Sequence, residues 1–225
     1  MAGLGDKQRG LNLIISRKII INVIIIVLIV IIIRGPTLYT SVINWDETAF
    51  ALVAREILNG HMPYDAAFDH KPVALYYPFA ASIAIFGDDP VSSRILGLFC
   101  IIASALIILW MLTKIFDDHS LMPTIICIAY IFANGGYGGS ATFSELLVNF
   151  YVLLWMLLIC IAIIKKSNAT AIAVGAVMAI SFHTNYLTGI YILLLTIAIT
   201  ASAFLAPKNN KKLSLKALSS FVAWH

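Results

Sequence analysis

The chain has 225 residues, of which 61% are hydrophobic and 12% are charged. An average soluble domain has roughly 45–50% apolar and about 25% charged residues, so the composition excludes an ordinary soluble globule. The net charge of +4 does not indicate binding of nucleic acid, because the basic residues stand in short clusters between apolar runs. That arrangement is typical of a protein oriented in a membrane.

Six apolar runs predict an all-α polytopic membrane protein with about six transmembrane helices. A spanning helix needs about 20 apolar residues, because roughly 30 Å of hydrocarbon is crossed at about 1.5 Å per residue. The first run is expected to remain as an anchor, since residues 34–36 offer no small-x-small cleavage site. The runs lie at about residues 18–34, 91–113, 120–135, 144–164, 169–184 and 188–206.

Basic clusters between the runs predict the orientation. Lys114, residues 165–166 and residues 207–216 fall on the same side as the basic residues of segment 7–18 if the spans alternate. Positive clusters stay in the cytoplasm, so we expect a cytoplasmic N-terminus, in a membrane such as the bacterial inner membrane. The long loop 35–90 is then extracytoplasmic.

Two interfacial helices are predicted within this outer loop. Residues 45–59 follow Asn44, and Glu47 three positions later is typical of a capping box. The apolar residues of this segment recur at helical spacing, so we expect the helix to lie flat with its apolar face toward the membrane. A second helix, residues 72–86, begins at a proline and is too short to span comfortably.

Asp46 and Glu47 are adjacent carboxylates at the start of the first interfacial helix. In one interpretation they only stabilise the helix start, by capping and by favouring the positive end of its dipole. In the other, a carboxylate at the membrane surface takes a proton from an acceptor that attacks an activated substrate. The two interpretations are compatible.

Cations in the same loop have a similar pair of interpretations. His70 and Lys71 stand just before the second interfacial helix, at the depth of lipid headgroups, and Arg55 lies on the polar side of the first helix. They are either solvated anchors or ligands of a substrate phosphate.

Two further outer segments carry polar residues. Residues 134–140 are rich in glycine without forming a nucleotide-binding pattern, and we expect a flexible loop. Glu145 follows it, and either caps the next helix or joins Asp46 across the outer face. Residues 183–186 predict a third outer turn.

One family shares an ordered set of these features. The segments WDETAFALVAREILNG at 45–60, PYD at 63–65 and DHKP at 69–72, followed by FG at 86–87 and RILG at 94–97, resemble the membrane glycosyltransferases of the GT-C class. The similarity is to the branch that contains the protein O-mannosyltransferases and the lipid A aminoarabinose transferase, and it covers about residues 13–205. In that branch an aspartate–glutamate pair opens the first outer loop, and a lysine–proline pair starts the next helix.

The resemblance implies an enzyme that moves a sugar from a polyprenyl-phosphate carrier to a lipid, glycan or protein acceptor on the outer face. It implies that Asp46 is the catalytic carboxylate, with Glu47 beside it, and that Lys71 binds the carrier phosphate. Arg55, His70 and Glu145 are the further candidates for substrate binding. The sequence indicates no particular cofactor, and a divalent metal is compatible with the expected reaction.

Two alternatives stay open. In the first, the chain is an inactive polytopic scaffold. In the second, it is a subunit that binds a polyprenyl lipid without catalysis. A transporter is disfavoured because the middles of the apolar runs hold almost no charges. Since the chain stops partway into another apolar run, at residues 219–225, we expect it to be the N-terminal part of a longer transferase.

Overall fold

The computed structural model describes residues 17–40, 44–116, 120–135, 141–165 and 168–205. Every regular element within these residues is a helix, as the all-α prediction requires. The α-helices are α1 (Arg17–Arg34), α2 (Trp45–Leu58), α3 (Tyr76–Phe86), α4 (Pro90–Leu112), α5 (Met122–Gly135), α6 (Ser144–Lys165), α7 (Asn168–Phe182) and α8 (Thr188–Leu205), and the 3₁₀ helices are η1 (Gly35–Tyr39) and η2 (Val73–Leu75).

Three helical segments among the described residues are long and apolar enough to cross a membrane: Lys18–Tyr39, Pro90–Leu112 and Ser144–Ala162. The apolar segments Met122–Asn134, Asn168–Phe182 and Thr188–Ala198 are shorter. The protein is therefore a helical protein associated with a membrane. The count of six spans stays a prediction.

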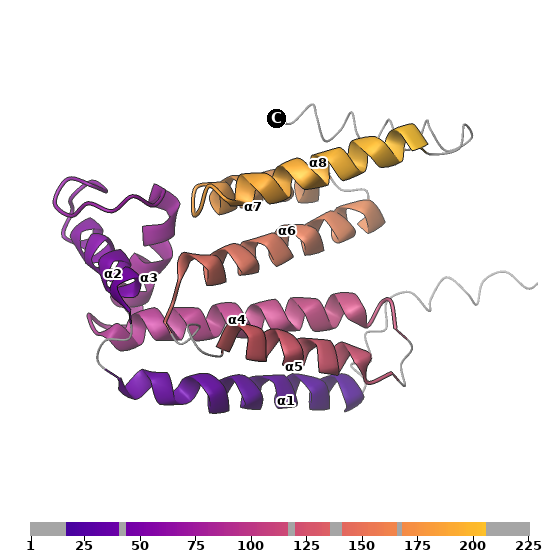
Figure 1. Cartoon of the computed structure of the whole chain (residues 1–225), viewed down its shortest axis with the longest axis horizontal. Coiled ribbons are helices and arrows are strands. Elements are labelled where there is room, and N and C mark those ends of the chain that lie inside the picture. Colours follow the sequence, from indigo (N-terminus) through magenta and orange to yellow (C-terminus); the bar gives the residue numbers. More distant parts are fainter. Residues whose placement is uncertain (1–16, 41–43, 117–119, 136–140, 166–167, 206–225) are drawn as a thin grey trace, which may run out of the picture.

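Helix α4 is at the centre of the bundle, with α1 and α5 on one side and α6 on the other (Figure 1). Ile26 and Val30 of α1 are buried against Ile101 of α4 and Ile131 of α5. Helix α7 packs on α6 and is followed by α8. Buried apolar side chains therefore pack the long helices against one another.

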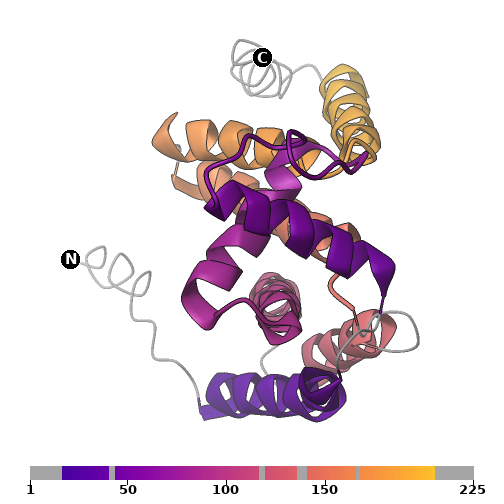
Figure 2. The same cartoon turned by 90° about the vertical axis from the view of Figure 1, so that its left-hand side faces the viewer.

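Helices α2 and α3 lie across one end of the bundle (Figure 1), and α2 passes in front of the long helices when this end faces the viewer (Figure 2). Helices α4 and α6 begin at this end, and the α7–α8 turn lies beside it. A backbone hydrogen bond from Ala74 N to His183 O (3.0 Å) joins η2 to that turn. The loop 35–90 and the turn at 183–186 are thus at the same end of the molecule, as predicted.

The opposite end carries the start of α1 and the ends of α4 and α6 (Figure 1). Lys18 Nζ donates a hydrogen bond to Ser120 O (3.0 Å) there. Lys18 and Lys114 therefore lie at the same end of the described bundle, which is consistent with the alternation of spans that the sequence predicts.

The prediction that α2 turns its apolar face toward the membrane is wrong. Phe50, Val53 and Ala54 are buried in a cluster with Tyr76 and Phe79 of α3, and the rings of Phe50 and Phe79 meet edge to face at 5.6 Å. Helix α3 removes this face from water and also packs closely against it. The predicted second helix is also altered, because Pro72 precedes a 3₁₀ turn and the α-helix begins at Tyr76.

Candidate functional site

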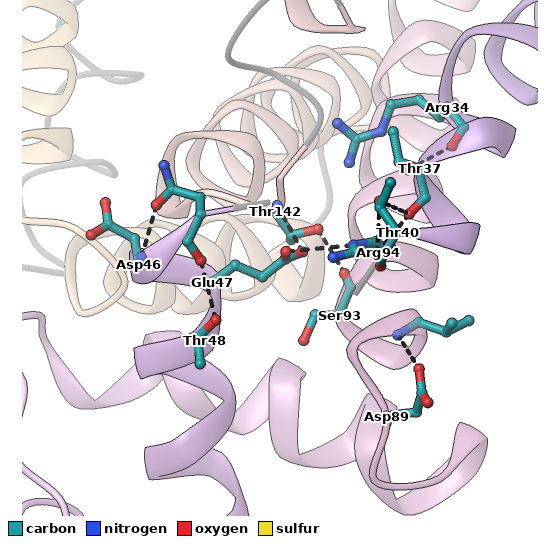
Figure 3. A network of polar contacts seen from close by, with 12 residues as sticks. Arg34, Thr37, Thr40, Asp46, Glu47, Thr48, Asp89, Ser93, Arg94 and Thr142 are labelled. Atoms are coloured by element: carbon teal, nitrogen blue, oxygen red, sulfur yellow. Dashed lines mark hydrogen bonds and ion pairs between the residues drawn. The ribbon is translucent and has the colours of Figure 1, made fainter. Parts of the chain in front are cut away.

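Asp46 lies in the first turn of α2 with its side chain exposed. Asn44 caps the helix, because Asn44 Oδ1 accepts a hydrogen bond from Asp46 N at 2.8 Å. In Figure 3 the carboxylate of Asp46 points away from that of Glu47. The two adjacent carboxylates therefore have different surroundings: Asp46 is at the protein surface and Glu47 is in the interior.

Glu47 is buried between α2, α4 and the segment before α6. Its Oε2 lies 3.5 Å from Arg94 Nε, and its Oε1 accepts a hydrogen bond from Thr142 N at 3.1 Å. The predicted capping box forms only in part. Asn44 caps α2, but Glu47 turns inward and does not bond to the helix start. A buried arginine, which the local sequence pattern does not show, provides the partner.

Arg94 joins this carboxylate to the end of α1. Its Nη1 donates to Thr37 O at 2.6 Å, to Thr40 O, and to Thr40 Oγ1 at 3.2 Å. Thr142 Oγ1 in turn donates to Ser93 O at 2.7 Å. The end of the first span, the start of α2, the start of α4 and the segment before α6 are thus connected by one polar network (Figure 3).

Arg34 is a second buried arginine at this network, with 1% of its surface exposed. The nearby charges that act on its guanidinium are the attractive one of Glu47 and the repulsive one of Arg94. Its three side-chain nitrogens have no hydrogen-bond acceptor among the residues that the structure describes. Arg34, Arg94 and Glu47 together carry one excess positive charge.

Sequence reasoning did not assign a site role to either buried arginine. Arg34 ends an apolar run, and Arg94 stands in the first turns of a spanning helix, so both positions resemble ordinary interface charges. One signal could have identified Arg94: a charged side chain within a spanning helix usually has a charged partner. For Arg94 that partner is Glu47.

Arg55, predicted as a candidate phosphate ligand, forms an ion pair with Asp88 instead. Arg55 Nη2 and Nε lie 2.7 and 2.9 Å from Asp88 Oδ1, and the two side chains are 45% and 53% exposed. This pair connects the last turn of α2 to the turn before α4. The pair uses two of the five N–H donors of Arg55 and offsets its charge, so Arg55 is a weaker candidate for binding a substrate phosphate.

His70 and Lys71 lie in a loop that two tyrosines organise. Tyr64 Oη and Tyr76 Oη donate to Lys71 O at 2.6 and 3.0 Å, and Tyr76 Oη also contacts Asp69 Oδ2 at 3.2 Å. His70 is 78% exposed with its Nδ1 at 2.9 Å from Asp69 Oδ1. Burial is the main reason that the pKa values of Tyr64 and Tyr76 are raised, so both hydroxyls stay hydrogen-bond donors.

Glu145 is exposed in the first turn of α6, where its Oε1 is 3.5 Å from Asn185 Nδ2. Asn185 also donates to Ser144 Oγ at 3.2 Å. Glu145 is therefore held toward the α7–α8 turn, whereas the contact between α2 and this region comes from Glu47 and Thr142. Residues 136–140 of the predicted glycine-rich loop lie outside the described residues.

Within the described part of the chain, no group of three or more His, Cys, Asp or Glu side chains is placed to hold a metal ion. The possible use of a divalent metal stays a prediction.

No family model, no curated protein and no solved structure matches this chain. The resemblance to the GT-C class therefore depends on the residue pattern over residues 45–97.

Proposed function

We propose that this protein is a membrane glycosyltransferase that moves a sugar from a polyprenyl-phosphate carrier to a lipid, glycan or protein acceptor on the extracytoplasmic face. The observation that supports it best is the position of Asp46, an exposed carboxylate at the start of α2 where the outer loop meets the spanning helices. In this proposal the chain contributes six spans to a GT-C type transmembrane domain in a bacterial inner membrane.

The chemistry follows from the place of the substrate. A polyprenyl phosphate keeps its tail in the bilayer, so the bond between sugar and phosphate is at headgroup depth. Asp46 accepts the proton of an acceptor hydroxyl, whose oxygen forms a bond to the anomeric carbon. The bond from that carbon to the phosphate oxygen breaks, and its electron pair leaves with the phosphate.

Cations stabilise the charge that grows on the leaving phosphate. Lys71 is the first candidate, because the tyrosine contacts fix its backbone carbonyl while leaving its amine outside these bonds. His70 is exposed beside it, and Arg55 and Glu145 are further substrate-binding candidates at the same end of the molecule.

The test measures the donor lipid in the organism's own membranes, with variants placed in the natural gene. In Asp46→Asn we expect the polyprenyl-phosphate sugar to accumulate, because its consumption stops while its synthesis continues. Asp65→Asn, which changes another exposed acidic residue of the same loop, is the matched control and should leave the donor at its normal level.

Other outcomes favour the alternatives. A polyprenyl-lipid-binding subunit would tolerate Asp46→Asn and lose bound polyprenyl lipid in Lys71→Ala, as measured by native mass spectrometry. An inactive scaffold would show neither change.

A further inference from the structure

We propose that Glu47 and Arg94 form a positioning pair that fixes the direction of Asp46 and does not itself react with the sugar donor or acceptor. This inference rests on the proposed role of Asp46 as the base. The two adjacent carboxylates then have different roles: Asp46 reacts and Glu47 positions it.

Burial separates Glu47 from any substrate. The side chains of Arg94 and Glu47 are 0% and 5% exposed, and both carboxylate oxygens of Glu47 have partners, Arg94 on one and the Thr142 backbone on the other. A general base must come within hydrogen-bond reach of the proton that it takes. Glu47 is buried and Asp46 is exposed, and their carboxylates point in different directions (Figure 3).

Helix geometry transmits this contact to Asp46. Consecutive residues of an α-helix are about 100° apart around the axis, so a first turn that holds Glu47 inward turns Asp46 outward. The bond from Asp46 N to Asn44 Oδ1 fixes the backbone at the same place.

The pair also fixes the first turn of α2 relative to the spanning helices. Arg94 belongs to α4 and donates to carbonyls of Thr37 and Thr40, which follow α1. Glu47 thus connects the first turn of α2 to both spans. The packing of Phe50, Val53 and Ala54 on α3 fixes the middle of α2, and the proposal is that this packing alone does not fix its first turn.

Amide hydrogen exchange in nanodiscs tests the contact without any need for activity. In Glu47→Ala and Arg94→Met, exchange should rise in peptides covering residues 44–50 and 141–146, because one partner is left without the other. Glu47→Gln should raise it less, since its amide oxygen still accepts from Thr142 N. This uncharged variant of similar shape also keeps the test valid if the other two do not fold.

The control is Asp88→Asn, which removes the exposed ion pair with Arg55 and should leave exchange at 141–146 unchanged. Equal protection in wild type, Glu47→Ala and Arg94→Met would overturn the proposal, because packing alone would then hold the first turn.

Donor turnover against pH separates positioning from chemistry. We expect Glu47→Gln to retain turnover with the acid limb of its pH profile in place, and Asp46→Asn to lose turnover with normal exchange. Loss of turnover in Glu47→Gln with normal exchange would show that Glu47 reacts, and would overturn the proposal. If wild type itself turns over no donor, the proposed function fails, and the exchange result still decides whether the pair holds α2.

Discussion

Gly97 determines whether the buried charges fit against α4. A Cβ at this position would stand 2.7 Å from Arg34 Nη2 and closer still to Thr142 Oγ1. Every residue larger than glycine therefore pushes the guanidinium or Thr142 out of place.

We predict that Gly97→Ala destabilises the protein by about 1–3 kcal/mol, as for other insertions into close-packed interiors. The matched control is Gly175→Ala in α7, where a Cβ meets no atom of the described structure within 4 Å. Alanine there should be neutral or stabilising by up to about 1 kcal/mol, because it favours the helix. Unfolding of the two variants in mixed micelles checks both, and equal effects would contradict the account of Gly97.

Tyr76 holds the loop that presents His70 and Lys71. Tyr76→Phe removes the hydrogen bonds to Lys71 O and Asp69. We expect the free energy of unfolding to fall by about 1 kcal/mol. Tyr77→Phe, at an exposed position in the next residue, is the control and should have no effect on the melting temperature.

The same tyrosine predicts a dependence on alkaline pH. Burial raises the pKa of Tyr76 above its ordinary value of 10.0, so the folded state favours the protonated hydroxyl. This contribution is complete below pH 10.0 and is lost as the pH rises through the folded pKa. Melting temperature measured on both sides of pH 10.0 should fall less steeply in Tyr76→Phe than in wild type.

At the scale of single helices, local signals fix where α4 begins. Asp89 Oδ1 accepts a hydrogen bond from Val91 N at 2.8 Å, and Pro90 occupies the first helical position. Asp89→Ala should cost about 1 kcal/mol, and Asp89→Ser should restore most of it, since serine also accepts from the helix start. An equal loss in both variants, measured by chemical unfolding, would show that the cap does not determine this helix start.

The start of α4 could be predicted from sequence for the same reason. An aspartate followed by a proline before an apolar run is a local signal, and the helix begins where that signal lies. The start of α2 was also predicted, because Asn44 is a strong cap. The partner of Glu47 could not be predicted, because Arg94 lies far along the chain and only the packing of α2 beside α4 brings them together.

The direction of the apolar face of α2 shows a second limit. Helical spacing shows that Phe50, Val53 and Ala54 share a face, yet periodicity is the same whether the face meets lipid or another helix. Helix α3 covers that face. The candidate site was thus predicted as a set of residues near one end, while the separation of Asp46 from Glu47 and the pairing of Arg55 with Asp88 required the structure.

For the whole molecule, the two ends of the bundle differ in charge, which predicts how it sits in a membrane. The start of α1, which holds Lys18, and the end of α4, which Lys114 follows, are at one end, while α2 lies across the other (Figure 1). We expect a reagent that cannot cross membranes to label Thr48→Cys from outside the cell and Lys114→Cys only after the membrane is opened, with the three native cysteines replaced. The reverse labelling pattern would invert the proposed orientation.

The hydrogen bond from Ala74 N to His183 O joins two segments that are synthesised at different times. Helices α2 and α3 leave the ribosome while α7 has yet to be translated, roughly a hundred residues later. The Ala74 N–H in loop 35–90 therefore lacks its acceptor, His183 O, until α7 has been made. Until then this N–H is satisfied by water, so the contact of η2 with the α7–α8 turn is among the later ones to form during synthesis.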